Sequence, residues 1–245
     1  MRRHRIRQTA ILAATGAVVL LTAPVAGRQT LPAPLPQRVA EMQYHFTDVS
    51  LVHEAIIRGE LTAVLAPARR LSTVPAPARM PESSRRFVEA IRLAGQRIVQ
   101  APTIENATVE VTRMLRQCGA CHQSMSVFPA RRTPARPDVG GIVGHMLEHQ
   151  RALDELLIGL VVPSDGRWKD GAARLGTAEL RPENWPAGRE LTAEVKQAEQ
   201  AVHSLALEAR KATAPLEQAT VYAKLLLTCA SCHGLHARIW GPRSQ

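Results

Sequence analysis

The sequence predicts an all-helical protein built from two tandem four-helix bundles, and three observations support this prediction. Aromatic residues make up only 3% of the chain, while Ala, Leu, Val, Arg, Glu and Gln dominate, which favours helices over β-sheet architectures. Apolar residues recur three and four positions apart, as in Val88, Ile91, Ala94 and Ile98. Finally, the two halves repeat one plan, because each begins with Met-x-x-His and ends with Cys-x-x-Cys-His.

The N-terminal residues 1–27 are predicted to be a secretory signal peptide. Four arginines precede an apolar run at 10–25, and polar residues follow it. This run is shorter than the roughly 20 residues that a spanning helix needs, so we expect cleavage and no stable membrane span afterwards. The predicted location of the mature protein is therefore the periplasm.

Proline-rich stretches divide the remainder of the chain. Residues 28–37 contain three prolines and are expected to form an extended tether, because proline lacks a backbone donor and disfavours helix in the residue before it. A second break, at 129–138, is rich in Pro and Arg and is expected to be the linker between domains. The predicted domains are 38–128 and 139–245.

Helical periodicity, interrupted by Gly and Pro residues that end helices, predicts four helices in each half. They are expected near 37–59, 60–73, 82–100 and 104–122, and near 140–160, 168–176, 187–210 and 214–233. The Met of each half precedes the first Cys by 76 residues in the first half and by 83 in the second. We expect the difference to be a small loop insertion around 163–171.

All four cysteines lie in the two copies of Cys-x-x-Cys-His, which is the attachment motif of c-type haem. The two thiols of the motif form thioethers with the porphyrin, and the adjacent imidazole binds the iron. On a helix these three residues share one face, as a rigid ring held at three points requires. The sequence therefore predicts two covalent haem c groups. The predicted thioether residues are Cys118, Cys121, Cys229 and Cys232, and the predicted iron ligands are His122 and His233.

Three other uses of these cysteines remain as alternatives. A structural zinc site would need both pairs to meet around one ion, although they end two separate predicted domains. A redox-active dithiol of the thioredoxin type belongs in a βαβ context, which the helical pattern does not supply. Structural disulfides would leave His122 and His233 without a role.

The late position of each motif narrows the comparison with known families. Only 12 residues follow His233, so the ligand on the far side of the iron must come from upstream or be absent. In this respect the chain resembles the class II cytochromes c, the cytochrome c prime and c-556 group, over nearly all of residues 38–236. The resemblance implies a four-helix bundle for each copy, with Cys-x-x-Cys-His near its C-terminal end. Single-domain members are the usual form, so the tandem arrangement departs from that pattern.

The candidates for the sixth iron ligand lie on the first helix of each half. In low-spin members of the resembled family a Met on this helix binds the iron, and Met42 and Met146 are at positions of that kind. His45 and His149 follow one turn later and rank slightly ahead, because imidazole is the commoner metal ligand. Core packing is the competing interpretation for all four residues. By a shift of register His53 or His145 could replace them, whereas His203 is expected at the surface.

The predicted function is electron transfer, without catalysis of a substrate reaction. No Ser-His-Asp set, phosphate-binding glycine loop or carboxylate pair stands out in the sequence. The alternative is a gas-binding or peroxide-reducing protein in which at least one haem is five-coordinate. Removal of residues 1–27 lowers the formal charge from +10 to +6. For an exported chain this charge argues against nucleic acid and favours an acidic or membrane-bound redox protein as the partner.

Overall fold

The computed structural model describes residues 35–76, 80–130, 132–185, 188 and 191–240. The predicted signal peptide at 1–27 and most of the predicted tether at 28–37 lie outside this part. Every regular element in the described residues is a helix, which confirms the all-helical prediction. The helices are α1 (Leu35–Ile57), α2 (Leu61–Ser72), α3 (Glu82–Val99), α4 (Ile104–Ser124), α5 (Gly141–Val161), α6 (Asp165–Thr177), the short 3-10 helix η1 (Pro182–Asn184), α7 (Ala193–Lys211) and α8 (Pro215–Trp240).

The helix boundaries differ from the expected ones where a local signal competes with periodicity. Helix α1 begins at Leu35, inside the predicted tether, because a proline in the first helical turn removes no needed hydrogen bond. Helix α7 begins at Ala193 rather than near 187, since the side chain of Thr192 accepts a hydrogen bond from the backbone of Val195 and caps the helix there. Helix α8 continues past the motif to Trp240.

The extra residues of the second half lie in a different loop from the one expected. The connections α1–α2 and α5–α6 are equally short, at 58–60 and 162–164. The longer segment is instead the α6–α7 connection at 178–192, which contains η1 and corresponds to the α2–α3 connection at 73–81. The prediction of an insertion around 163–171 is therefore wrong. Pro163 ends α5 without lengthening the loop.

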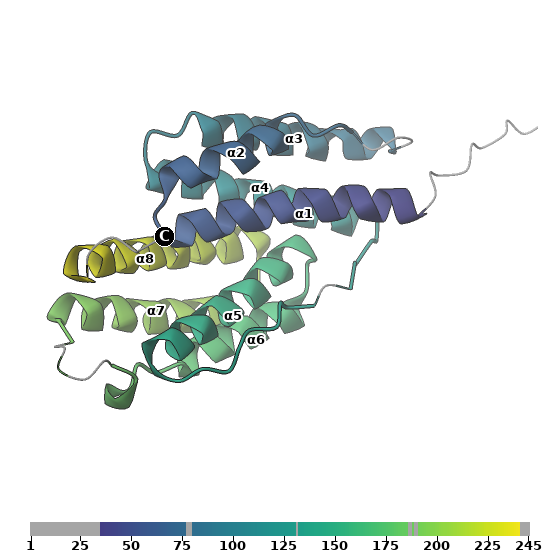
Figure 1. The fold of residues 1–245 in the computed structure, drawn as a ribbon. Coiled ribbons are helices and arrows are strands. Elements are labelled where there is room, and N and C mark those ends of the chain that lie inside the picture. The colour runs from purple at the N-terminus through teal and green to yellow at the C-terminus, as the bar shows by residue number, and fades with distance from the viewer. Residues whose placement is uncertain (1–34, 77–79, 131, 186–187, 189–190, 241–245) are drawn as a thin grey trace, which may run out of the picture. The chain divides into compact units, whose positions relative to one another are not determined.

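The helices of the two halves pack against each other through α4 and α8, and α4 also contacts α5 while α1 contacts α8 (Figure 1). All described helices belong to one compact unit, and buried residues of both halves form a continuous hydrophobic core. Trp168 and Tyr222 are among the largest fully buried side chains. The indole of Trp168 donates a hydrogen bond to the carbonyl oxygen of Ala209 at 2.7 Å, so its polar atom is satisfied inside the core.

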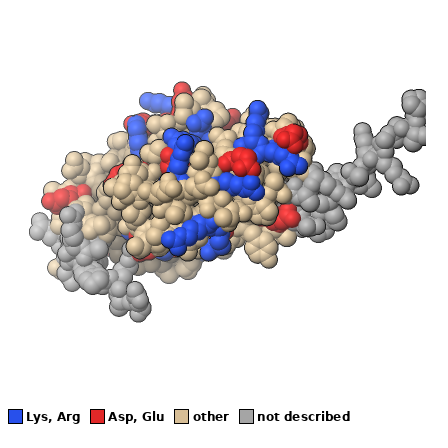
Figure 2. Space-filling view, turned by 90° about the horizontal axis from the view of Figure 1, so that it is seen from above, with Lys and Arg blue, Asp and Glu red and all other residues tan. Residues whose placement is uncertain are grey.

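Basic and acidic side chains are interspersed on the face of the molecule that Figure 2 shows. Some of these charges pair along one helix, as Arg85 does with Glu82 and Arg92 with Glu89 in α3. Such pairs keep the surface solvated but add little to stability. None of the described helices combines the length and apolar character that crossing a membrane requires.

Candidate functional site

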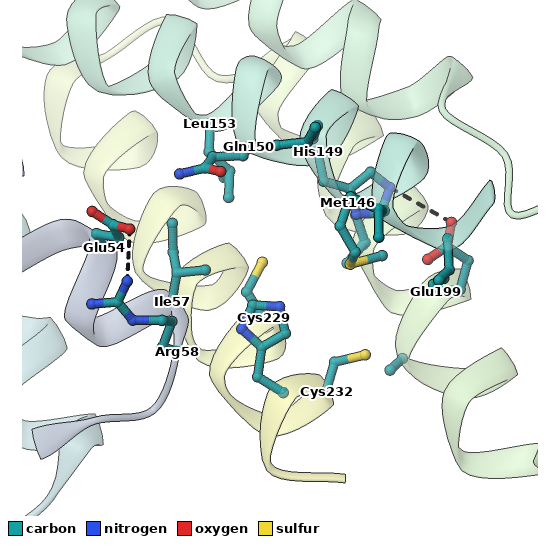
Figure 3. A pocket seen from close by; sticks show the side chains of 16 residues that line it. Glu54, Ile57, Arg58, Met146, His149, Gln150, Leu153, Glu199, Cys229 and Cys232 are labelled. Atoms are coloured by element: carbon teal, nitrogen blue, oxygen red, sulfur yellow. Dashed lines mark hydrogen bonds and ion pairs between the residues drawn. The ribbon is translucent and has the colours of Figure 1, made fainter. Parts of the chain in front are cut away.

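The second Cys-x-x-Cys-His motif borders a cavity of about 380 Å³ between α1, α5, α7 and α8 (Figure 3). Cys229, Cys232 and His233 all line this cavity from α8. Most of the other lining side chains are apolar, as expected for a site that takes a large and mainly hydrophobic ligand. The apolar residues are Ile57, Ile142, Val143, Leu147, Leu153, Ala198 and Val202.

The structure brings the two predicted far-side ligands of the second half, Met146 and His149, to this same cavity. Both residues lie on α5, across the cavity from α8. The thioether of Met146 points into the space that the Cys229 thiol also faces, whereas the ring of His149 is directed toward Glu199 (Figure 3). Nε2 of His149 lies 3.3 Å from the carbonyl oxygen of Ala178 and 3.6 Å from Oε1 of Glu199.

All four cysteines are free thiols in the structure. Burial raises the pKa of Cys118 and of Cys229 to about 12 and that of Cys232 to about 11, with nearby acidic groups adding to the effect. A redox-active dithiol depends on a lowered thiol pKa, which its electropositive surroundings provide. The surroundings of these thiols therefore do not favour thiol-disulfide exchange chemistry.

The first motif lies near the C-terminal end of α4, where α4 meets the end of α5. Nδ1 of His122 lies 2.7 Å from the carbonyl oxygen of Val161, the last residue of α5. Burial lowers the pKa of His122, although this hydrogen bond opposes the change. With Nδ1 engaged in this way, Nε2 is the ring nitrogen left for another partner.

Met42 and His45, the far-side candidates of the first half, are half-buried near the start of α1. Burial lowers the pKa of His45, against the raising effects of Glu41 and Asp48. Their relation to the first motif remains a prediction.

The close contact between α4 and α5 depends on Gly119, the second residue of the first motif. A Cβ at this position would lie 2.4 Å from the carbonyl oxygen of Leu160, which is a backbone atom that cannot move aside cheaply. We expect Gly119→Ala to lower the free energy of unfolding by about 1–3 kcal/mol, because overpacking outweighs the better helix propensity of Ala. Urea unfolding followed by circular dichroism measures the change.

Gly234→Ala in α8 is the matched control for this prediction. An added Cβ there meets no atom within 4 Å, so this variant is expected to keep or slightly raise the free energy of unfolding. Equal stability of the two variants would mean that the α4–α5 contact can relax without cost.

Equivalent contacts join each motif to the region where the first helix of the other half ends. Gly59 and Pro163 each stand 17 residues after the Met of their half. Gly119 faces Leu160 and Pro163, and the equivalent residue of the second motif, Ala230, faces Gly59. Gly59 has a φ of +71°, a backbone conformation that favours glycine. The sequence repeat is therefore also a repeat of contacts, in which each motif packs against the opposite half.

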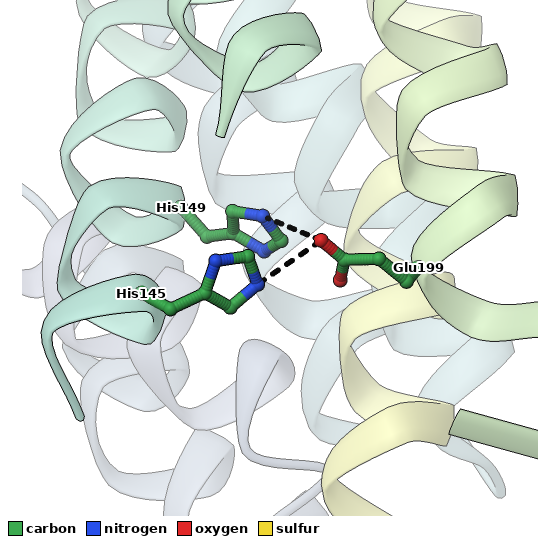
Figure 4. Close-up of side chains that lie close together, drawn as sticks. All are labelled: His145, His149 and Glu199. Atoms are coloured by element: carbon green, nitrogen blue, oxygen red, sulfur yellow. Dashed lines mark ion pairs between the residues drawn. The ribbon is translucent and has the colours of Figure 1, made fainter. Parts of the chain in front are cut away.

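A cluster of imidazoles around Glu199 is the part of the site that sequence reasoning missed. His145 and His149 in α5 both point toward the Glu199 carboxylate in α7 (Figure 4). His203, which was expected at the surface, is half-buried and lies 3.3 Å from the same carboxylate oxygen. The signal that could have found this cluster is the spacing of four between His145 and His149 and between Glu199 and His203.

Burial and the cluster's own contacts set the charges of these groups. Burial lowers the pKa of His149 to about 4, although the Glu199 charge opposes this shift. For Glu199, burial would raise the pKa, but the hydrogen bond from His145 and the neighbouring imidazoles outweigh it, so the net direction is down. At neutral pH Glu199 is therefore ionised and His149 is neutral.

Comparison with protein-family models, with curated proteins and with solved structures finds no match to this chain. The function is therefore inferred from the motifs, the cavity and the contacts of the chain itself.

Proposed function

We propose that this protein is a periplasmic electron carrier that holds two c-type haems covalently, one at each Cys-x-x-Cys-His motif. The observation that carries the proposal is the composition of the cavity at the second motif. Two thiols, the adjacent imidazole and a thioether from the facing helix line one apolar space (Figure 3). The resemblance to class II cytochromes c points to the same function.

The residues at the second motif fit a haem in their chemistry. The cavity volume of 380 Å³ falls within the range of about 300–1,000 Å³ for small-molecule and cofactor sites. Arg58 is the cation that lines this cavity, and it is held by Glu54 at 2.6 Å and by Glu60 at 3.1 Å. To bind a carboxylate at the edge of a porphyrin, this guanidinium would have to exchange one of its two carboxylate partners.

At the first motif, the feature that fits a haem is the hydrogen-bonding contact of His122. A metal-bound imidazole usually donates its other ring N–H to a carboxylate or a backbone carbonyl, which fixes the tautomer and the ring orientation. The distance of 2.7 Å between Nδ1 of His122 and the oxygen of Val161 corresponds to such a contact. This contact supports His122 as an iron ligand through Nε2.

A bound haem would supply reversible one-electron chemistry, and the residues of the chain set the conditions for it. The apolar lining would exclude water, and Cys229, Cys232 and His233 would hold the group. Met146 lies on the opposite wall with its thioether turned inward, and His149 is directed toward Glu199. A filled sixth position favours electron transfer over the binding of gas or peroxide, so this arrangement supports the electron-carrier proposal and favours Met146 as the ligand of the second iron.

The two sites would lie within one compact unit, because α4 and α8 carry the motifs and pack against each other. Two one-electron sites in one unit suit a carrier that passes electrons between proteins. The proposed partner is an acidic or membrane-bound redox protein in the same compartment.

The test is to count haems on the exported protein, expressed together with a c-type maturation system. Mass spectrometry of the mature chain is expected to show the mass of two added haems, and the pyridine haemochrome spectrum to show thioether-linked haem. The double variant Cys229→Ala with Cys232→Ala is expected to retain one haem, because each motif provides its own two thioether bonds.

The matched variant Cys118→Ala with Cys121→Ala is expected to lose the other haem. A wild-type mass without added haem would overturn the proposal, and so would a double variant that still carries two haems. Stoichiometric carbon monoxide binding to either haem of the reduced wild type would replace electron transfer by the gas-binding alternative.

A further inference from the structure

Three histidines converge on one carboxylate between α5 and α7. Figure 4 shows two of them, His145 and His149, and His149 and Glu199 also line the cavity at the second motif. The side chains of His145 and His149 are 3% and 8% exposed, and that of Glu199 is 16% exposed. Spacing of four residues within each helix places the two histidines on one face of α5. The same spacing places Glu199 and His203 on one face of α7, opposite them.

The distances from the two histidines of α5 to Glu199 are close to those between ligands of a small metal ion. Nε2 of His145 lies 3.0 Å from Oε1 of Glu199, and Nε2 of His149 lies 3.6 Å from it. One ligand atom from each of these three residues lies within 4.8 Å of the others. Two ligands that each bind Zn²⁺ at about 2.0–2.1 Å in tetrahedral geometry are about 3.3 Å apart.

We propose that His145, His149 and Glu199 form a binding site for a divalent transition-metal ion of the zinc type. Two imidazoles and one carboxylate are a ligand set that Zn²⁺ uses, with water in the fourth position. The carboxylate provides the negative charge that a buried cation needs. His203 contacts the same carboxylate from α7 at 3.3 Å, and it is a positioning residue that orients Glu199.

The site goes beyond the proposed function and does not depend on a bound haem. Its ligands come from α5 and α7, whereas the motifs lie on α4 and α8. It also gives the buried His149 ring a partner other than the iron. Hydrogen bonding of three histidines to one carboxylate is the competing explanation of the cluster, and it predicts no affinity for metal.

The test is zinc titration of the mature, untagged holoprotein after dialysis against a chelator. Isothermal titration calorimetry with Zn²⁺ is expected to show one equivalent bound. X-ray absorption at the zinc edge, where haem iron does not interfere, is expected to show nitrogen and oxygen ligands with imidazole scattering. Glu199→Gln keeps the size of the side chain but removes its charge, and it is expected to weaken zinc binding by about 100-fold or more, because it removes a direct ligand.

Two further variants test whether weaker zinc binding comes from the loss of a ligand or from a general change in the protein. Glu208→Gln, on the exposed face of the same helix, is expected to bind zinc as the wild type does. His203→Gln is expected to weaken binding by about 10-fold, as loss of a positioning residue does, and it serves as the second variant should Glu199→Gln fold poorly.

Three results would overturn the proposal. These are the absence of stoichiometric zinc binding, undiminished binding by both Glu199→Gln and His203→Gln, or sulfur ligands in the absorption spectrum. A haem count of zero in the same preparation would contradict the haem proposal alone, because zinc binding is measured separately.

Discussion

If the second motif holds a haem as proposed, replacing Met146 by alanine is expected to turn that haem into a site that binds one equivalent of carbon monoxide in the reduced state. The reason is that Met146 lines the cavity opposite the motif and its thioether faces inward (Figure 3). With the sulfur removed, the sixth position of the proposed haem would be open, because His149 is directed toward Glu199, and an open position binds small gases. Optical titration of the reduced protein measures this change, and the oxidised variant should lose one sulfur-to-iron band in near-infrared magnetic circular dichroism.

His149→Ala is the discriminating control, because both residues line the same cavity from α5. This variant is expected to keep the sulfur-to-iron band and to remain closed to carbon monoxide, while losing zinc affinity. In the reverse pattern, His149→Ala would bind carbon monoxide and Met146→Ala would not. This result would support the sequence-based ranking, which places His149 ahead of Met146 as the candidate iron ligand.

Local patterns were sufficient to predict where the helices lie. Val88, Ala94 and Ile98 recur at helical spacing, and all three are buried in the structure. Such a pattern depends on one face of one segment, so the sequence near each residue contains the information. The Cys-x-x-Cys-His motifs are local signals of the same kind, and their position near the end of the fourth helix of each half followed from counting residues.

Contacts between distant segments could not be predicted in this way. His53 was considered an iron ligand by a shift of register, but its ring contacts Tyr222, 169 residues further along the chain. His145 was considered for the same reason, and it faces Glu199. Which buried polar groups meet is decided by how the helices pack, and periodicity does not specify that packing.

How the two halves pack together could not be predicted from the sequence either. The repeated motifs suggested two bundles separated by a linker at 129–138. The close approach of Gly119 to Leu160 and of Ala230 to Gly59 appears only when α4 and α8 are placed against the first helices of the opposite halves. Small residues at these points are visible in the sequence, but the partner of each is not.

The buried His53 is expected to make the protein sensitive to mild acid. Nε2 of His53 lies 2.6 Å from the Tyr222 hydroxyl, and this hydroxyl donates a hydrogen bond to the carbonyl oxygen of Leu153 at 3.3 Å. Burial lowers the pKa of His53 to about 4, and the positive charge of Arg136 contributes to the same shift. Arg136 is itself paired with Asp154 at 2.7 Å. These are the polar groups that α5, α8 and the linker contribute around the ring.

The direction of the pH effect on stability follows from the difference between the pKa of His53 in the folded and in the unfolded protein. Above the unfolded-state pKa of about 6.5, the imidazole is neutral in both states and costs no stability. As the pH falls from about 6.5 toward 4, the unfolded chain binds a proton that the folded protein cannot, so the free energy of unfolding decreases. At pH 5 the loss from this one group is about 2 kcal/mol, since each pKa unit corresponds to about 1.4 kcal/mol.

His53→Gln keeps a hydrogen-bonding group near the Tyr222 hydroxyl but cannot titrate in this range. Urea unfolding at pH 7.5 and at pH 5 is expected to show that the wild type loses about 2 kcal/mol more than the variant does between these two values. The difference between the proteins removes the contributions of the other histidines, which both share. Equal losses would mean that His53 takes up its proton while folded, which would require Tyr222 and Arg136 to move away from the ring.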